Sequence, residues 1–236
     1  ANNGIINMKD KTIIPFSPEY YVTAKNATNY NPNAEKPIIN GFDVDNWIKS
    51  IANYDDEIEQ LLWQIIHAIL TPNKIWEKIY ILIGDGLNGK GTFQQLVKNL
   101  LGMNNISALL PDDFKDKFMI SSLIGKVANI GDDIPPNYIG DPSNLMSIVT
   151  GDTIQIDRKY KDPMTANIRI GCMFSANKMP NSANKSNGWY RRILPVPFTA
   201  SFQGKQDKRI KEEYLADKKV LEYVYKKAIE MDFETF

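Results

Sequence analysis

The segment KIYILIGDGLNGKGTFQQLVKNLLG, residues 78–102, decides the fold. Its first six residues, Lys78–Ile83, are mostly apolar and predict a short buried strand. A loop with glycines follows at Gly84–Thr92, and the pattern from Lys90 to Leu101 predicts a helix. A strand that runs through a glycine-rich loop into a helix is the local structure that a phosphate-binding loop requires.

The loop residues predict how a nucleotide would be held. Glycines let the backbone curl so that several N–H groups point at one anion, and the helix N-terminus adds partial positive charge. Lys90 is expected to reach the β- and γ-phosphates of ATP. A glycine-rich turn that binds nothing is the alternative. The residues expected to bind ATP are Gly84, Asp85, Gly86, Leu87, Asn88, Gly89, Lys90, Gly91, Thr92 and Phe93.

The residue after the lysine departs from the usual form of such a loop. A Ser or Thr at this position ordinarily ligates Mg²⁺, whereas this chain has Gly91. The nearest hydroxyl belongs to Thr92, so either Thr92 or a water is expected to contact the metal.

An ATPase also needs acids at the end of a strand, which hold Mg²⁺ and polarise the attacking water. The segment KVANIGDDI, residues 126–134, supplies Asp132 and Asp133 after an apolar run. By position, Asp132 is assigned to the metal and Asp133 to the catalytic base, and the two could exchange. Aspartates after a strand are equally common as turn or helix-capping residues.

A basic segment follows at residues 150–161, TGDTIQIDRKYK. It predicts a hairpin that turns at Asp162-Pro163 before a strand at Ile168–Ala176. Cationic residues around an aromatic one suit contact with a sugar-phosphate backbone, with stacking on the ring. A solvated hairpin with exposed lysines is the alternative. The candidate DNA-binding residues are Arg158, Lys159, Tyr160 and Lys161.

Two further sites complete the candidate catalytic set. Asn177 follows the strand Ile168–Ala176, at the strand end where an open α/β sheet keeps its ligand. It is expected to orient the hydrolytic water, although an Asn before Lys178-Met179-Pro180 also suits a turn. Arg191 and Arg192 precede a strand in GWYRRILPVPF, and they either pack structurally or place an arginine finger in a neighbouring subunit's ATP site.

Along the chain, residues 74–201 alternate strand and helix signals and predict an α/β core with a mostly parallel sheet. Residues 1–73 form an irregular and helical N-terminal part, with helices at Val44–Ala52 and Asp55–Leu70 and a stop at Thr71-Pro72-Asn73. Residues 202–236 form a C-terminal segment with one or two helices within Gln206–Met231. The expected core elements are strands at Lys78–Ile83, Val127–Gly131, Thr153–Asp157, Ile168–Ala176 and Ile193–Phe198, and helices near Lys90–Leu101 and Pro142–Thr150.

Composition limits the remaining classes of function. The 28 Lys and Arg balance the 28 Asp and Glu, so attraction to DNA must come from a local patch. Apolar runs are too short to span a bilayer and no signal segment opens the chain, which predicts a cytoplasmic protein without a membrane partner. Cys172 and His67 each lie in apolar surroundings without a second Cys or His nearby, so a zinc site is not expected. The chain begins with Ala and is interpreted as part of a longer polypeptide.

Taken in this order and spacing, the motifs resemble those of superfamily 3 helicases, AAA+-type ring motors, and among them the phage and plasmid primase-helicase group. GDGLNGKGT looks like motif A, NIGDDI like motif B and TGDTIQIDRKYK like motif B′. FSANKMP looks like motif C, and GWYRRILPVPF like the arginine-finger segment. The N-terminal part resembles the helical domain that precedes the motor. Asp133 departs from the pattern, because a glutamate is common at that position.

The resemblance implies an AAA+-like motor that uses ATP and Mg²⁺ at the interfaces of a hexameric ring of identical subunits. Arg192 or Arg191 would act in trans, and Lys159 and Lys161 would point into the central channel. Such enzymes unwind forked DNA while moving 3′ to 5′ on single-stranded DNA, in the bacterial host cytoplasm where the gene belongs to a phage or plasmid. A primase or origin-recognition region is expected in flanking parts of the polypeptide.

Two other functions are compatible with the phosphate loop. Adenylate-kinase-like nucleotide kinases share GxxxxGKGT, but their loop lies close to the N-terminus, whereas about eighty residues precede it here. They also carry lid arginines, and arginines are scarce here between the loop and the B′-like segment. An ATP switch, such as an origin-binding or loader protein, needs the same pocket and the same trans arginine as a helicase.

Overall fold

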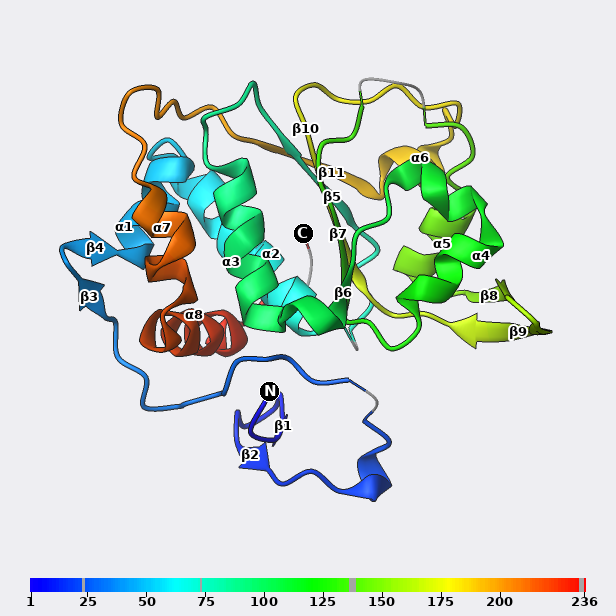
Figure 1. The fold of residues 1–236 in the computed structure, drawn as a ribbon, viewed down its shortest axis with the longest axis horizontal. Coiled ribbons are helices and arrows are strands. Elements are labelled where there is room, and N and C mark those ends of the chain that lie inside the picture. Colours follow the sequence, from blue (N-terminus) through cyan, green and yellow to red (C-terminus); the bar gives the residue numbers. More distant parts are fainter. Residues whose placement is uncertain (23, 73, 136–138, 234–235) are drawn as a thin grey trace.

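A computed structural model describes residues 1–22, 24–72, 74–135, 139–233 and 236 of the chain. At its centre lies a five-stranded sheet in the order β11-β5-β10-β7-β6, and helices cover both faces (Figure 1). Every neighbouring pair in this sheet is parallel, which confirms the expected α/β class. The strands are β5 (Ile79–Ile83), β6 (Ile106–Ser107), β7 (Ala128–Gly131), β10 (Gly171–Ala176) and β11 (Ile193–Pro197).

Strand order brings distant segments together. Strand β10 lies between β5 and β7, with Phe174 opposite Ile81 on one side and Gly131 on the other. All five strands run the same way, so the loops that follow β5, β7 and β10 meet at one edge. The segments that precede β7, β10 and β11 lie at the opposite edge.

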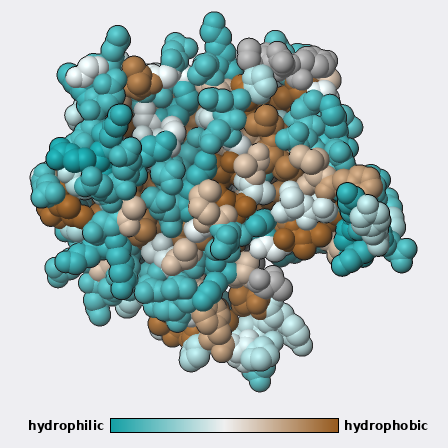
Figure 2. Space-filling view, in the orientation of Figure 1, coloured by the Kyte–Doolittle hydropathy of each residue, from teal (hydrophilic) through white to brown (hydrophobic). Residues whose placement is uncertain are grey.

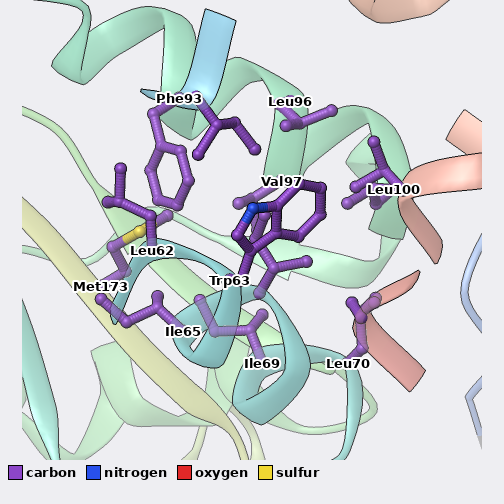
Figure 3. Packing of buried hydrophobic residues seen from close by; sticks show 14 of the residues in the cluster. Leu62, Trp63, Ile65, Ile69, Leu70, Phe93, Leu96, Val97, Leu100 and Met173 are labelled. Atoms are coloured by element: carbon purple, nitrogen blue, oxygen red, sulfur yellow. The ribbon is translucent and has the colours of Figure 1, made fainter. Parts of the chain in front are cut away.

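The first face of the sheet is covered by helices from three parts of the chain (Figure 1). Apolar side chains of these helices and of the sheet form one buried cluster, part of which Figure 3 shows around Trp63, Leu96 and Met173. Helix α2 lies close against β10, because a Cβ on Gly171 would come within 2.9 Å of the Ile69 side chain. The helices are α1 (Val44–Ile51), α2 (Asp56–Leu70), α3 (Lys90–Leu101), α7 (Lys208–Glu212) and α8 (Lys218–Glu230).

The second face carries shorter helices and a second apolar cluster, in which the Phe114 and Phe174 rings meet edge to face. Cys172 is buried in β10, and burial raises the pKa of its thiol to about 12, so it is a strand residue without nucleophilic character. The helices on this side are α4 (Lys117–Ile120), α5 (Ser143–Thr150) and α6 (Asn187–Tyr190), with 3-10 turns at Pro111–Lys115 and Ser121–Leu123.

The N-terminal segment contains two short hairpins and little other regular structure, as expected. The pairs are β1 (Ile5–Ile6) with β2 (Ile13–Ile14), and β3 (Ile38–Ile39) with β4 (Phe42–Asp43). A 3-10 turn at Pro18–Tyr20 separates the two hairpins, and two further 3-10 turns lie at Met103–Asn105 and Tyr214–Ala216. Helix α2 ends at Leu70, where the sequence predicts a stop; Asn73 of that stop lies outside the described residues. The boundaries at residues 73 and 201 stay predictions.

The basic hairpin forms, but the prediction of its turn at Asp162-Pro163 was wrong. Strand β8 (Thr153–Arg158) pairs with β9 (Lys161–Asn167), and the chain turns at Lys159-Tyr160. Asp162 and Pro163 lie inside β9, opposite the shift in register between Ile156 and Arg158 of β8. A two-stranded ribbon has only edge strands, so Pro163 is tolerated at the irregularity. The strand predicted at Ile168–Ala176 begins at Gly171 in the structure, three residues later than predicted, and ends at Ala176 as predicted.

Hydrophilic side chains cover most of the face shown in Figure 2, and apolar residues appear there in separate patches. Within the described residues, no helix is both long enough and apolar enough to cross a membrane.

Candidate nucleotide-binding site

The loop after β5 adopts a conformation that its glycines make possible. Gly86 and Gly89 have φ values of 100° and 93°, in the left-handed region. A Cβ on Gly89 would also lie 2.6 Å from Ile51 of helix α1. Gly84 has no room for a side chain either, because a Cβ there would collide with Asn88 and with the Phe198 carbonyl. The two ends of the loop, at Gly84 and Gly89, are therefore packed tightly against their surroundings.

Two hydrogen bonds tie this loop to the chain after β11. The Asn88 side-chain amide donates to the Phe198 carbonyl at 3.2 Å, and the Phe202 N–H donates to the Leu87 carbonyl at 2.8 Å. Asn88 is 3% exposed, so its amide acts as a structural link inside the loop.

Lys90 opens helix α3 and folds back over the loop, where its Nζ donates a hydrogen bond to the Gly84 carbonyl. The residue is 6% exposed. Burial lowers the pKa of its ammonium, while the carboxylates of Asp133 and Asp85 act in the opposite direction. The Lys90 ammonium is buried and donates to a backbone carbonyl. It is therefore well placed to bind a phosphate, whose negative charge would balance its own positive charge.

A cleft of about 500 Å³ opens beside Lys90 at the edge where the strands end. It brings together Lys90, Thr92, Asp132, Asp133 and Asn177, although these residues come from three separate segments of the sequence. Asn177 is exposed in the loop after β10, between the phosphate loop and the two acids.

The two aspartates differ in their surroundings. Asp132 pairs with Lys98 of helix α3 at 2.9 Å, and its side chain is 59% exposed. Asp133 has a φ of 41°, and its N–H donates to the Ser175 hydroxyl of β10 at 2.9 Å. The backbone of Asp133 is therefore fixed against the neighbouring strand, while Asp132 is held through an ion pair at the surface.

Oxygen ligands for Mg²⁺ are available in this cleft. The Thr92 hydroxyl and the Asp132 carboxylate both line it, and Mg²⁺ is commonly held by one or two protein oxygens together with phosphate oxygens and waters. Among the described residues, no group of three or more His, Cys, Asp and Glu side chains could hold a metal ion by itself. The residues present fit a magnesium ion that arrives with the nucleotide.

Gly91 and Phe93 have opposite surroundings. A Cβ on Gly91 would meet nothing within 4 Å, because this face of helix α3 opens into the cleft. Phe93 is fully buried and its ring lies 6.0 Å from that of Phe198, so only its backbone is near the loop. Gly84 and Asp85 also lie outside the cleft lining.

Several lining residues were missed from the sequence, namely Gln94, Gln95, Lys98, Ser175 and Lys211. Gln94 and Lys98 follow Lys90 at intervals of four on helix α3, a spacing that places all three on one face. The Gln94 amide donates to the Gly131 carbonyl at 3.2 Å and joins helix α3 to the end of β7. That helical spacing was the available signal; Ser175 and Lys211 enter the cleft only through tertiary packing.

The two arginines lie outside the cleft, at the opposite edge of the sheet. They directly precede β11, and its five residues span about 16 Å. Arg192 is half-buried and donates to the Gly188 carbonyl at 2.6 Å, while its Nε is buried without a partner among the described residues. Arg191 is 64% exposed at its side chain and lies 3.6 Å from Glu77.

The tip of the β8–β9 hairpin is fully accessible. Tyr160 is 93% exposed, and Lys159 Nζ lies 5.3 Å from its ring centroid. Lys161 is exposed as well. Arg158 is half-buried and its guanidinium donates to the Asp162 carbonyl at 3.0 Å, which braces the turn. Of the four candidates, only the three tip residues are available to a ligand.

A parallel sheet covered on both faces, with a glycine-rich loop leading from β5 into α3, defines a core of the P-loop type. A family model matches residues 82–192, and its description is a family of unknown function, DUF5906. A protein of Acanthamoeba polyphaga mimivirus named "Putative helicase L207/L206" is 25% identical over 193 residues, which cover 75% of this chain.

The fold is shared with solved structures. The A form apo structure of the NrS-1 C terminal region has a TM-score of 0.62 and 18% identity over 90% of this chain. A second apo structure of that region has a TM-score of 0.63 and 17% identity over 93% of this chain. The chain spans 19% of the mimivirus protein and about half of the NrS-1 chains, 49% and 50%.

Proposed function

We propose that this chain is the motor domain of a DNA helicase of the superfamily 3 type, which binds ATP with Mg²⁺ and hydrolyses it at subunit interfaces. The observation that carries the proposal is the cleft that gathers Lys90, Thr92, Asp132 and Asp133 beside the phosphate loop. The similarity to a protein named as a helicase supports the choice of this class over other P-loop enzymes.

The proposed chemistry follows from the placement of the charged groups. Lys90 and the loop N–H groups hold the phosphates, and Thr92 and Asp132 hold Mg²⁺, which when bound neutralises charge on the transferred phosphate. Asp133 accepts a proton from the attacking water, and Asn177 orients that water. These roles are consistent with a backbone at Asp133 that is fixed by Ser175.

The position of the arginines supports catalysis between subunits. Arg191 and Arg192 precede β11, whose five residues span about 16 Å, and neither lines the cleft of its own chain. An arginine that neutralises the transition state must then come from a neighbour. The exposed, weakly held side chain of Arg191 fits this role better than that of Arg192.

The hairpin supplies the contact to DNA in this proposal. Lys159 and Lys161 flank an exposed Tyr160 at the tip of the β8–β9 ribbon. In a ring, six copies concentrate positive charge in the channel although the protein has no net charge. Single-stranded DNA is the proposed track and forked DNA the proposed substrate.

ATP hydrolysis tests this function directly. We expect phosphate release from ATP and Mg²⁺ to rise on addition of single-stranded DNA, and a tailed fork to be unwound. Lys90→Ala should abolish both activities, whereas Lys218→Ala at an exposed site on α8 should change neither. Transfer of phosphate to AMP without any response to DNA would indicate a nucleotide kinase, and nucleotide binding without hydrolysis would indicate an ATP switch.

A further inference from the structure

A second groove, of about 450 Å³, lies at the edge of the sheet away from the nucleotide cleft. One wall comes from the N-terminal segment between Ala1 and Asn26. The other wall includes the end of helix α2, Val127 before β7 and Arg169 before β10. In Figure 1 the N-terminal segment lies below the lower ends of these elements.

The charge of this groove has one sign. Four cationic side chains line it, those of Lys25, Lys74, Lys126 and Arg169, and no Asp or Glu does. Among the described residues none of the four takes part in an ion pair, although acids and bases are equal in number over the whole chain. Lys74 and Lys126 each donate to one backbone carbonyl, which leaves an ammonium group two further donors. Such a groove attracts an anion.

Aromatic rings stand in the same groove with their surfaces in solvent. Phe16, Tyr20 and Tyr21 are 45%, 52% and 88% exposed. A short turn fixes the tyrosines, because the Ser17 hydroxyl accepts from the Glu19 N–H and the Tyr21 N–H donates to the Pro18 carbonyl. Lys25 Nζ lies 5.6 Å from the centroid of the Phe16 ring. Exposed rings with adjacent cations are typical of surfaces that stack bases and track phosphates.

The groove also adjoins the basic hairpin. Arg169 follows the last residue of β9, Asn167, by two positions. A Cβ on Gly151, just before β8, would lie 3.9 Å from the Arg169 guanidinium. Strand β9 has seven residues and spans about 23 Å from its exposed tip to this base. Cationic groups therefore occur at the tip of the ribbon, at its base and along the groove.

We propose that this groove binds single-stranded nucleic acid, with its phosphates on the four cations and its bases stacked on Tyr20 and Tyr21. The biological use of the groove rests on the proposed helicase function, since the strand would then extend from the hairpin tip. The binding itself needs no ATP. Bases account for the exposed rings, which an anion without aromatic groups would leave unused.

Charge removal tests the phosphate contacts. The double variant Lys126→Ala/Arg169→Ala is compared with Lys218→Ala/Lys219→Ala, which removes two lysines at the start of helix α8, outside the groove lining. Fluorescence anisotropy with a labelled twenty-nucleotide oligo-dT, without nucleotide, should show binding weakened about tenfold by the first pair only. The slope of log K against log salt should fall by about 1.4, because each phosphate contact to a single strand contributes about 0.7. Equal affinities of the two double variants would overturn the proposal.

Stacking is tested separately with Tyr21→Trp. Its control, Tyr54→Trp, replaces a tyrosine that is also exposed and also has a positive φ but does not line the groove. Oligo-dT should quench the new tryptophan at residue 21 and not that at residue 54, and an abasic oligomer of equal length should quench neither. Quenching by the abasic oligomer, or no quenching by oligo-dT, contradicts the stacking role.

The two proposals fail in distinguishable ways. One outcome is that the Lys159→Ala/Lys161→Ala variant loses DNA-stimulated ATP hydrolysis while the groove variants do not affect oligo-dT binding. This outcome would contradict the proposal that the groove binds DNA and would leave the proposed helicase function supported. If oligo-dT binding depends on the groove residues but the protein hydrolyses no ATP, the proposed binding groove is supported and the proposed motor function is contradicted.

Discussion

Gly91 occupies a place where a side chain would fit, because a Cβ there meets nothing within 4 Å and the residue faces the nucleotide cleft. The adjacent Thr92 supplies the nearest hydroxyl. The absence of a hydroxyl at residue 91 is therefore not imposed by crowding, and Thr92 can be tested as its replacement.

We predict that Thr92→Val, which keeps the shape but loses the hydroxyl, lowers ATP hydrolysis about a hundredfold and raises the Mg²⁺ concentration for half-maximal rate. Adding Gly91→Ser to this variant should restore most of the rate, since the new hydroxyl enters open space. A Mg²⁺ titration of phosphate release checks both variants. An unchanged Mg²⁺ dependence in Thr92→Val would mean that water, not Thr92, completes the metal shell.

At the same scale, the sequence predicted the position of the glycine-rich loop between a strand and a helix, and it predicted the residues that line the cleft only in part. Lys90, Asp132, Asp133 and Asn177 each follow a local signal, namely glycines or a strand end, and they meet because parallel strands end at one edge. Lys98 was missed although its helical spacing from Lys90 was a signal, and only its pairing with Asp132 depends on how helix α3 packs beside β7. Lys211 comes from a separate C-terminal helix, and no local pattern relates it to the loop.

At the scale of elements, helix α3 was predicted at both of its ends, since Gly89 and Gly102 mark them and the apolar spacing fills the interval. The β8–β9 turn was misplaced because Asp-Pro is common turn chemistry. Here Tyr160 takes the left-handed conformation instead, with φ 58°. The short 3-10 turns at Pro111–Lys115 and Ser121–Leu123 were not predicted, because they are too short to show a periodic apolar pattern in the sequence.

The two arginines precede β11, at the end of the sheet away from the phosphate loop, and this position leads to a prediction. Arg191→Ala should lose ATP hydrolysis about a thousandfold, as expected for an arginine finger, with nucleotide affinity little changed. Arg192→Ala should instead lower the thermal midpoint, because its guanidinium holds the Gly188 carbonyl.

Mixing subunits provides the control. Arg191→Ala and Lys90→Ala proteins should each be inactive, but together they should recover partial hydrolysis, because some interfaces then combine an intact loop with an intact arginine. No recovery on mixing would count against action in trans. An Arg192→Ala protein that is inactive alone and recovers hydrolysis when mixed with Lys90→Ala, beside an active Arg191→Ala protein, would reverse the assignment of the two arginines.

Helices α2 and α8 are joined by His67, which is 5% exposed and lies 2.7 Å from the Ala228 carbonyl through Nδ1. Burial, the largest cause, lowers the pKa of the imidazole, while the Ala228 carbonyl acts in the opposite direction. The folded state therefore binds this proton less readily than the unfolded state, whose His has a pKa near 6.5.

Stability should accordingly be fully present above about pH 6.5 and should fall as the pH decreases below that value. We predict that the urea midpoint decreases between about pH 7 and pH 5, and decreases less in His67→Gln. Urea titrations of both proteins at matched ionic strength measure this difference. Parallel pH profiles would show that other groups account for the effect.

At the scale of the whole molecule, one chain holds a phosphate loop at one edge of the sheet and arginines at the other. On the proposed mechanism, such a molecule would be incomplete for hydrolysis by itself, so assembly and nucleotide binding should be linked. We predict that ATP, Mg²⁺ and single-stranded DNA together shift the mass in solution from the monomer toward six times that value, measured by light scattering. A mass that stays at the monomer under all conditions, with full ATP hydrolysis, would exclude the ring.

The hydrogen bonds from Asn88 to Phe198 and from Phe202 to Leu87 have a consequence for motion. They fasten the phosphate loop to the connection that leads into α7, whose Lys211 lines the same cleft. If ATP is hydrolysed in this cleft as proposed, a change of loop shape on release of the γ-phosphate would therefore be transmitted to the C-terminal helices. Those helices pack on α2 and α3, so the helices before and after the parallel sheet would move together with the loop.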